Sequence, residues 1–411
     1  MMTATVTERV TYRQVFAEPR FRLLFLTRSL AIGADALRIL ALSTLIFALT
    51  GSTLLAAATF GIGFVPQAIG GTLLGALADR VPPRPLITVG YSLEAATATV
   101  LALADLPAGA SLALVAVIAC LTPVFGGASS RLVAEALTGD AYVLGRSVFS
   151  IASATAQLAG LAAGGLTVAT IGARHALLVT AGCHLAAAVA IRLRLPNLPA
   201  ARKPGAQQAG SVFRQSLAGS RLLLGDRAIR LLLLANWLPP AFITGAEGLI
   251  VPYVAGRGFA ADSAGPLLAC LAVGMIVGDL VVGRLLRPVM RERLTIPLML
   301  IAGLPLLAFA ARLSLAVSAG LLIVTGTGLA YVLGLQRRFL DAVPEPIRGH
   351  AFGLQSTGVM TLQGVGPVML GALAEVTSIG QAMALAGAAT AVTALWLQKP
   401  LSRSGGASAG R

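Results

Sequence analysis

Apolar runs, each close to the length that a bilayer requires, alternate with short polar segments along almost the whole chain. A helix of about 20 apolar residues crosses the hydrocarbon core of a membrane. The pattern predicts an all-α membrane protein with 12 transmembrane helices, at residues 21–49, 54–77, 85–104, 110–130, 147–170, 173–194, 229–254, 263–286, 294–312, 315–335, 351–375 and 379–398.

Basic residues divide the predicted loops into two classes. The loops on the side of both chain ends, with the ends themselves, carry 26 of the 31 Lys and Arg residues, and the opposite loops carry only Arg174, Arg257 and Arg312. Basic residues collect on the cytoplasmic side of membrane proteins. We therefore expect a bacterial inner-membrane protein with both termini in the cytoplasm. The net charge of +15 is explained by topology, so we expect no nucleic-acid partner.

The two halves of the chain repeat one another. Residues 75–80, after the second predicted span, correspond to residues 283–288 after the eighth, and Arg131 corresponds to Arg338. Paired six-helix halves around an axis along the membrane normal are a known transporter plan, with the binding site between them. We expect pseudo-symmetric six-helix bundles at residues 21–194 and 229–398. The rest divides into a cytoplasmic N-terminus (1–20), a linker with a short surface helix (195–228) and a disordered tail (399–411).

Two loops carry family motifs. The first reads Gly75-Ala-Leu-Ala-Asp79-Arg80-Val-Pro-Pro-Arg84 and resembles the Gly-x-x-x-Asp-Arg-x-x-Arg-Arg signature of the major facilitator superfamily. The second contains Arg348-Gly349 and resembles a turn in that superfamily's macrolide and siderophore exporters. The resemblance implies a major facilitator fold and a cytoplasmic charge gate made by Gly75, Asp79, Arg80, Arg84, Arg131, Arg348 and Gly349. Alternatively, Arg80 and Arg84 serve only the topology.

The chain also departs from the family pattern. The antiporter signature of the fifth helix appears as Gly160-Leu161-Ala-Ala-Gly164-Gly165, without its proline. Thr122 stands near the place where drug antiporters carry an arginine, and Arg287 replaces the acidic residue in the second copy of the gate motif. These departures weaken the resemblance to drug antiporters in particular.

The first predicted span carries three charged residues, Arg28, Asp35 and Arg38. Charge inside a membrane is costly and usually functional. Asp35 and Arg38 are three residues apart, so they share a helix face and can pair. Because burial and a neighbouring cation act in opposite directions on a carboxylate's affinity for protons, Asp35 beside a movable cation can take up and release a proton. The alternative is a permanent structural ion pair.

Three other intramembrane carboxylates are further candidates for proton coupling, namely Glu94, Glu247 and Asp279. Glu247 follows Pro239-Pro240, which interrupt helical hydrogen bonding, and it could instead bind a cationic substrate. Asp279 has an alternative partner in Arg284, five residues further along the chain. We expect His184 to be packed or hydrogen-bonded.

Polar and aromatic residues within the spans indicate a binding pocket, for which we expect Gln157, Asn236, Trp237, Phe242 and Gln363. Each could instead serve helix packing, because polar side chains also join membrane helices. The glycines of the fifth and eleventh spans are expected at the seam between the halves. The scattered cysteines and histidines indicate neither a metal site nor a disulfide framework.

Together these features predict a secondary active transporter and not an enzyme. We expect a monomer that exports small amphipathic compounds, such as antibiotics, siderophores or secondary metabolites, by alternating access and in exchange for protons. The chain lacks a Gly-x-x-x-x-Gly-Lys-Ser/Thr phosphate loop, so a proton gradient and no cofactor is the expected energy source. An importer of the same fold, a polytopic membrane enzyme and a channel remain open as alternatives.

Overall fold

A computed structural model describes residues 11–74, 77–137, 139–200, 220–344 and 347–404, and these ranges contain helices and no strand. The N-terminal half comprises α1 (Tyr12–Ala17), α2 (Pro19–Thr50), α3 (Thr53–Gly61), α4 (Phe64–Leu74), α5 (Leu77–Arg80), α6 (Pro83–Leu103), α7 (Ala108–Ala136) and α8 (Gly139–Arg194). The C-terminal half comprises α10 (Arg227–Gly248), α11 (Ile250–Gly256), α12 (Ala264–Leu280), α13 (Pro288–Arg293), α14 (Thr295–Leu307), α15 (Leu315–Gly328), α16 (Tyr331–Ala342), α17 (Arg348–Val376) and α18 (Ile379–Ser404).

Ten helical segments within the described residues are long and apolar enough to cross a membrane. One of them, Leu144–Arg194, contains a backbone break at Gly172, where φ is 82° and ψ is 159°. This break falls between the predicted spans 147–170 and 173–194, and only glycine adopts such a conformation without strain. A shorter apolar helix, Thr295–Ala310, lies where the ninth span was predicted. The all-helical membrane fold is confirmed, and the count of 12 and the pseudo-symmetry stay predictions.

The domain boundaries also stay predictions. Residues 220–225 are helical and precede α10, whose first turn is capped by Asp226 through bonds to the backbone N–H groups of Ala228 and Ile229. The central part of the predicted linker, with most of its surface helix, lies outside the described residues. The last helix continues to Ser404, six residues beyond the end of the predicted span, and the remainder of the tail is likewise outside the described residues.

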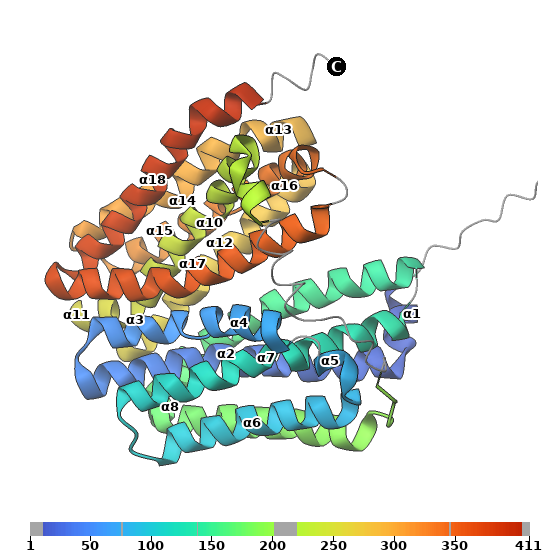
Figure 1. The fold of residues 1–411 in the computed structure, drawn as a ribbon. Helices are drawn as coiled ribbons and strands as arrows, with labels where there is room; N and C mark the ends of the chain where they lie inside the picture. Colours follow the sequence, from blue (N-terminus) through green and yellow to red (C-terminus); the bar gives the residue numbers. More distant parts are fainter. Residues whose placement is uncertain (1–10, 75–76, 138, 201–219, 345–346, 405–411) are drawn as a thin grey trace, which may run out of the picture.

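The two halves meet at one end and diverge toward the other, where α1 and α16 lie (Figure 1). At the joined end, α3 packs along α17, and α8 packs along α12. Small residues allow these close approaches: Gly61 faces the backbone of Gly364, and Gly165 faces that of Gly265. Thr53 donates a hydrogen bond to the carbonyl of Gly371 at 3.2 Å, and Glu375 accepts one from Ser52. We call this region the joined end.

A hydrophobic core crosses the joined end. Its buried members include Leu40 and Phe60 from the N-terminal half and Leu249, Leu268 and Leu370 from the C-terminal half. The other cores each lie within one half, around Phe21 and Leu132 in the N-terminal half and around Tyr331 and Leu335 in the C-terminal half. Apolar packing therefore closes the joined end, and each half keeps a core of its own.

Candidate functional site

A cavity of about 690 Å³ lies between the two halves. Its wall is formed by α2, α3, α4 and α8 on one side and by α10, α12, α16 and α17 on the other. This volume is in the range of about 300–1,000 Å³ that small-molecule sites occupy. We call it the central cavity.

The central cavity brings together most of the predicted pocket and coupling residues. Gln157, Asn236 and Gln363 line it, with Asp35, Glu247 and Asp279. The amide of Gln363 donates a hydrogen bond to the Thr244 hydroxyl at 3.4 Å. The described lining contains three carboxylates and no Lys, Arg or His, so the wall is acidic.

Glu247 and Asp279 have no ion-pair partner among the described residues. Glu247 is half-buried, and Asp279 is exposed toward the cavity. The alternative pairing of Asp279 with Arg284 is absent from the described ion pairs. Residues three or four apart share a helix face, whereas Arg284 is five residues after Asp279 and so points away from it. Both carboxylates are therefore available to a ligand.

A buried cluster of four side chains lies beside the central cavity, namely Asp35, Arg38, Glu94 and His184. The Arg38 guanidinium is 3.0 Å from Oδ1 of Asp35 and 3.8 Å from Oε2 of Glu94. The Nε2 atom of His184 is 3.4 Å from the same Oδ1. The Asp35 side chain is 31% exposed and that of His184 1%, so Asp35 connects the cluster to the cavity.

Three helices position this cluster. Asp35 and Arg38 share one face of α2, as their spacing predicted, while Glu94 comes from α6 and His184 from α8. The Thr122 hydroxyl on α7 donates to Oε1 of Glu94 at 3.2 Å. Arg38 therefore has two alternative carboxylate partners within reach.

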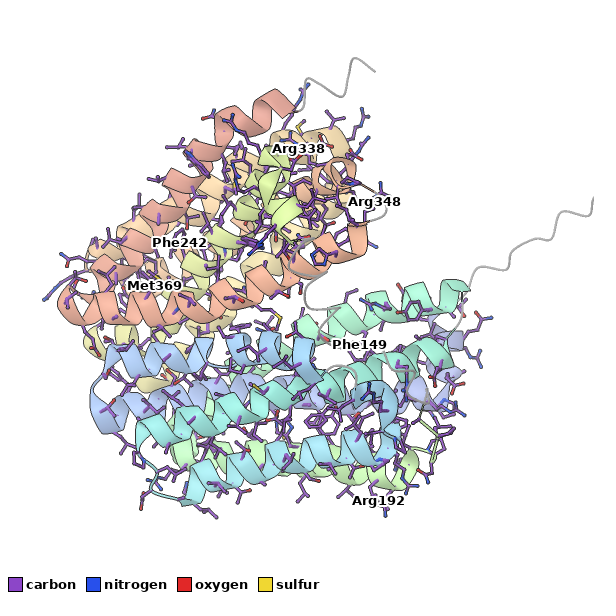
Figure 2. The ribbon with its side chains drawn as sticks, viewed as in Figure 1. Phe149, Arg192, Phe242, Arg338, Arg348 and Met369 are labelled. Carbon is purple, nitrogen blue, oxygen red and sulfur yellow. The ribbon has the colours of Figure 1, made fainter. Side chains whose placement is uncertain are left out.

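A second cavity, also of about 690 Å³, lies between the halves nearer the diverging end. Helices α2, α4, α7 and α8 form most of its wall, and Thr357 and Met360 of α17 complete it. Figure 2 shows Phe149, one of its lining residues, on the edge of the N-terminal half that faces the C-terminal half. Arg28 and Arg146 line it, and no described carboxylate does. We call this cavity the vestibule.

Two predicted pocket residues lie elsewhere. Trp237 donates its ring N–H to the carbonyl of Gln355 at 3.0 Å and packs against Gly358. Phe242 packs against the hydrophobic core of the joined end and lies within the C-terminal half in Figure 2. Neither side chain belongs to the described lining of the central cavity. Trp237 and Phe242 are both on α10, but the face of α10 that lines the cavity carries Asn236, Pro240 and Glu247.

The predicted gate residues lie toward the diverging end. Arg84 donates a hydrogen bond to the carbonyl of Arg192. The Nε atom of Arg131 is 3.4 Å from Oε1 of Glu135. Arg348 donates to the carbonyl of Val343 at 3.4 Å. Arg80 is exposed, and Gly349 lies in the first turn of α17. Figure 2 shows Arg192, Arg338 and Arg348 toward this end. Gly75 and the side chain of Asp79 lie outside the described residues, so the charge gate stays a prediction.

Sequence reasoning did not rank His184 and Thr122 among the site residues. His184 belongs to the cluster and Thr122 donates a hydrogen bond to it, because helices distant in the sequence pack together. Helical periodicity carries no information on that packing. One feature of the sequence could have indicated the cluster: His184 is an ionisable side chain within an apolar span, and such residues are usually functional. Asp35, Glu94 and His184 offer ligand atoms within 4.8 Å of one another, but the Arg38 guanidinium lies among them. This positive charge disfavours a metal ion there.

Two helical bundles joined at one end, with a polar cavity between them, are typical of multi-pass membrane transporters. The chain belongs to the Major Facilitator Superfamily, because the model of that family matches residues 24–339. No significant match was found among curated proteins. The family makes this chain a transporter of small molecules and not an enzyme.

Solved structures share the fold. The chain is similar to a point mutant of the nucleoside transporter NupG, with a TM-score of 0.77 and 13% identity over 92% of this chain and 99% of that one. It is also similar to a POT family transporter in complex with a thioalcohol-conjugated peptide, with a TM-score of 0.71 and 10% identity over 93% of this chain and 96% of that one.

Proposed function

We propose that the protein exports small amphipathic compounds that carry a positive charge, in exchange for protons. The observation that carries this proposal is the position of the buried cluster beside an acidic central cavity. Asp35 belongs to both, so one carboxylate can respond to a proton and to a substrate. A shared site of this kind is the simplest way to couple two opposite fluxes.

The cluster supports proton exchange through its alternative pairings. When a proton neutralises Asp35, Arg38 can pair with Glu94, which lies 3.8 Å away. When Asp35 loses the proton, the 3.0 Å pair is restored. Because a carboxylate inside a membrane needs a partner, Arg38 stabilises whichever carboxylate is charged. His184 lies 3.4 Å from Asp35 and is a second group that can exchange a proton with it.

The acidic lining supports a cationic substrate. Glu247 and Asp279 face the central cavity without a basic partner among the described residues, and apolar side chains such as Ile39, Phe60 and Leu271 surround them. Apolar walls with a few placed polar groups suit drug-sized ligands.

The orientation of the loops supports a cytoplasmic opening. The diverging end carries the loops that are rich in basic residues, which the positive-inside rule places in the cytoplasm. In this arrangement the central cavity would receive substrate from the cytoplasm, as an exporter in the inner membrane requires. An importer of the same fold would use this state to release its substrate.

Direction is tested with the purified protein in liposomes. Ethidium, a fluorescent amphipathic cation, is added outside vesicles with an acidic interior. We expect proton-driven accumulation of ethidium, which ceases when the gradient is dissipated. Absence of gradient-driven movement for ethidium and a panel of related cations would contradict the proposal. Co-transport of substrate in the same direction as protons would instead favour the importer.

Replacement of Glu247 with glutamine is expected to weaken binding of ethidium at least about tenfold, because opposite charges about 4 Å apart at an effective dielectric constant of about 20 attract by about 4 kcal/mol. Glutamine keeps the size of the side chain and removes its charge. Fluorescence titration of the detergent-purified protein measures the affinity. Gln336→Ala, at a neutral position of the same cavity wall, is the matched control. Equal loss in both variants would show that the charge of Glu247 does not recognise the ligand.

A further inference from the structure

A third cavity, of about 20 Å³, adjoins the buried cluster within the N-terminal half. Its lining includes Asp35, Glu94 and His184 of the cluster, together with Arg28, Gly126 and Ser129. A cavity of about 10–15 Å³ is large enough to hold one water molecule, and a buried water typically has two to four polar partners. The size and the lining of this small cavity both suit a single water.

Buried polar atoms point to the same occupant. Nδ1 of His184 is buried and has no hydrogen-bond partner among the described residues. Oε2 of Glu94 and Nε2 of His184 are also buried and have only ion-pair contacts, at 3.8 Å to Arg38 and 3.4 Å to Asp35. Glu94 is 6% exposed and His184 1%. Because leaving a buried polar atom unpaired costs about 1–3 kcal/mol, a water between these side chains would stabilise both.

The small cavity also connects the cluster to the vestibule. Arg28, Thr122, Gly126 and Ser129 line both of these cavities. Asp35 is the one described residue that the small cavity shares with the central cavity. A path from the vestibule to the cluster therefore runs through α2 and α7 of the N-terminal half. It does not cross the acidic cavity where the substrate is proposed to bind.

We infer that a water molecule in the small cavity carries protons between the vestibule and the cluster, so that protons and substrate take separate routes to Asp35. As the water accepts a proton from the vestibule, it gives another to Glu94, His184 or Asp35 in the same step, so it is restored as neutral water and adds no cation beside Arg38. The inference rests on the proposed proton-coupled function. The charged or titratable groups facing the path come from α2, α6 and α8, and are Arg28, Asp35, Arg38, Tyr91, Glu94 and His184.

A monovalent metal ion is the competing occupant. The carboxylates and His184 could supply ligands, but Arg38 already holds a positive charge 3.0 Å from Asp35 and 3.8 Å from Glu94. A neutral water avoids the repulsion that a second fixed cation would experience there. A sodium gradient in place of the proton gradient distinguishes the two.

Gly126 allows the route to be blocked with little strain. A Cβ atom at this position would meet no heavy atom within 4 Å, so a larger side chain enters the space shared by the vestibule and the small cavity. Ser130→Leu is the matched control, because Ser130 lines the vestibule but is not part of the described lining of the small cavity.

The test compares two activities of the full chain in proteoliposomes. Ethidium exchange at equal pH requires the conformational cycle but no net proton movement, whereas accumulation in acid-inside vesicles requires both. We expect Gly126→Leu to keep exchange within about twofold and to lower accumulation about tenfold or more, since a positioned proton donor or acceptor is worth about 10²–10⁴ in rate. Ser130→Leu should retain both activities.

Each outcome decides the question. Normal accumulation by Gly126→Leu would overturn the route and leave the proposed function intact. A wild-type protein that exchanges ethidium but ignores the pH gradient would overturn both, as would accumulation driven by sodium alone. If Gly126→Leu loses exchange as well, Ser129→Val at the same junction decides: selective loss of accumulation supports the route, and parallel loss overturns it.

Discussion

Asp35→Asn is expected to abolish accumulation of ethidium in acid-inside vesicles, down to the level of vesicles without protein. Asparagine has the shape of aspartate but cannot take up the coupling proton. Exchange of ethidium at equal pH should persist, because it needs no protonation cycle and because Glu247 and Asp279 still offer the cation two carboxylates. The two activities, measured on the same preparation, separate a loss of coupling from a loss of transport.

The variant is expected to remain folded. Removing one partner of a buried ion pair typically costs about 3–5 kcal/mol when the other charge is left alone. Here Glu94 lies 3.8 Å from the Arg38 guanidinium and can take over the pairing. Asp105→Asn is the control, since Asp105 pairs with Arg174, is 86% exposed and belongs neither to the cluster nor to the described lining of the central cavity. Unchanged accumulation by Asp35→Asn would remove Asp35 from the coupling role.

Helices were the most predictable feature of this chain. The span predicted at 21–49 corresponds to α2 at Pro19–Thr50, and the turn predicted after residue 170 contains the break at Gly172. Hydrophobic length indicates the approximate extent of such helices, because an unpaired backbone in lipid is too costly for other structures. The second span shows the limit of this reasoning, since a turn at residues 62–63 divides it into α3 and α4.

Contacts within one helix were also predictable, and contacts between helices were not. The Asp35–Arg38 pair follows from a spacing of three residues and is present at 3.0 Å. Glu94 could not be ranked from the sequence, since its importance depends on α6 packing beside α2. The pocket prediction for Trp237 rested on residue type, and the rotation of α10 directs its indole to the carbonyl of Gln355 instead.

In the proposed alternating-access cycle the joined end must open, so this end is as important to the proposal as the cluster is. The joined end closes where helix surfaces without side chains allow two backbones to approach closely. At Gly61 on α3, an added Cβ atom would overlap the carbonyl oxygen of Gly364 on α17. This obstacle is backbone on both sides, so neither partner can move aside by changing a rotamer.

Gly61→Val is therefore expected to disfavour the closed form of this end. Overpacking typically costs about 1–3 kcal/mol, and a cost of one or two kcal/mol changes a two-state ratio about 5- to 30-fold. Spin labels at Thr50 and Thr377, both exposed at the joined end, should show a longer mean distance in the variant. The three native cysteines would first be replaced by alanine.

Gly182→Val on α8 is the matched control, because a Cβ atom there would meet nothing within 4 Å. It adds the same β-branched side chain to a membrane helix and should leave the distance between the labels unchanged. We also expect Gly61→Val to lose ethidium exchange, since a protein held open at one end cannot complete the cycle. An unchanged label distance together with normal exchange would show that the α3–α17 contact tolerates the added bulk. The closing of the joined end would then depend on the contact between α8 and α12, where Gly165 and Gly265 approach each other.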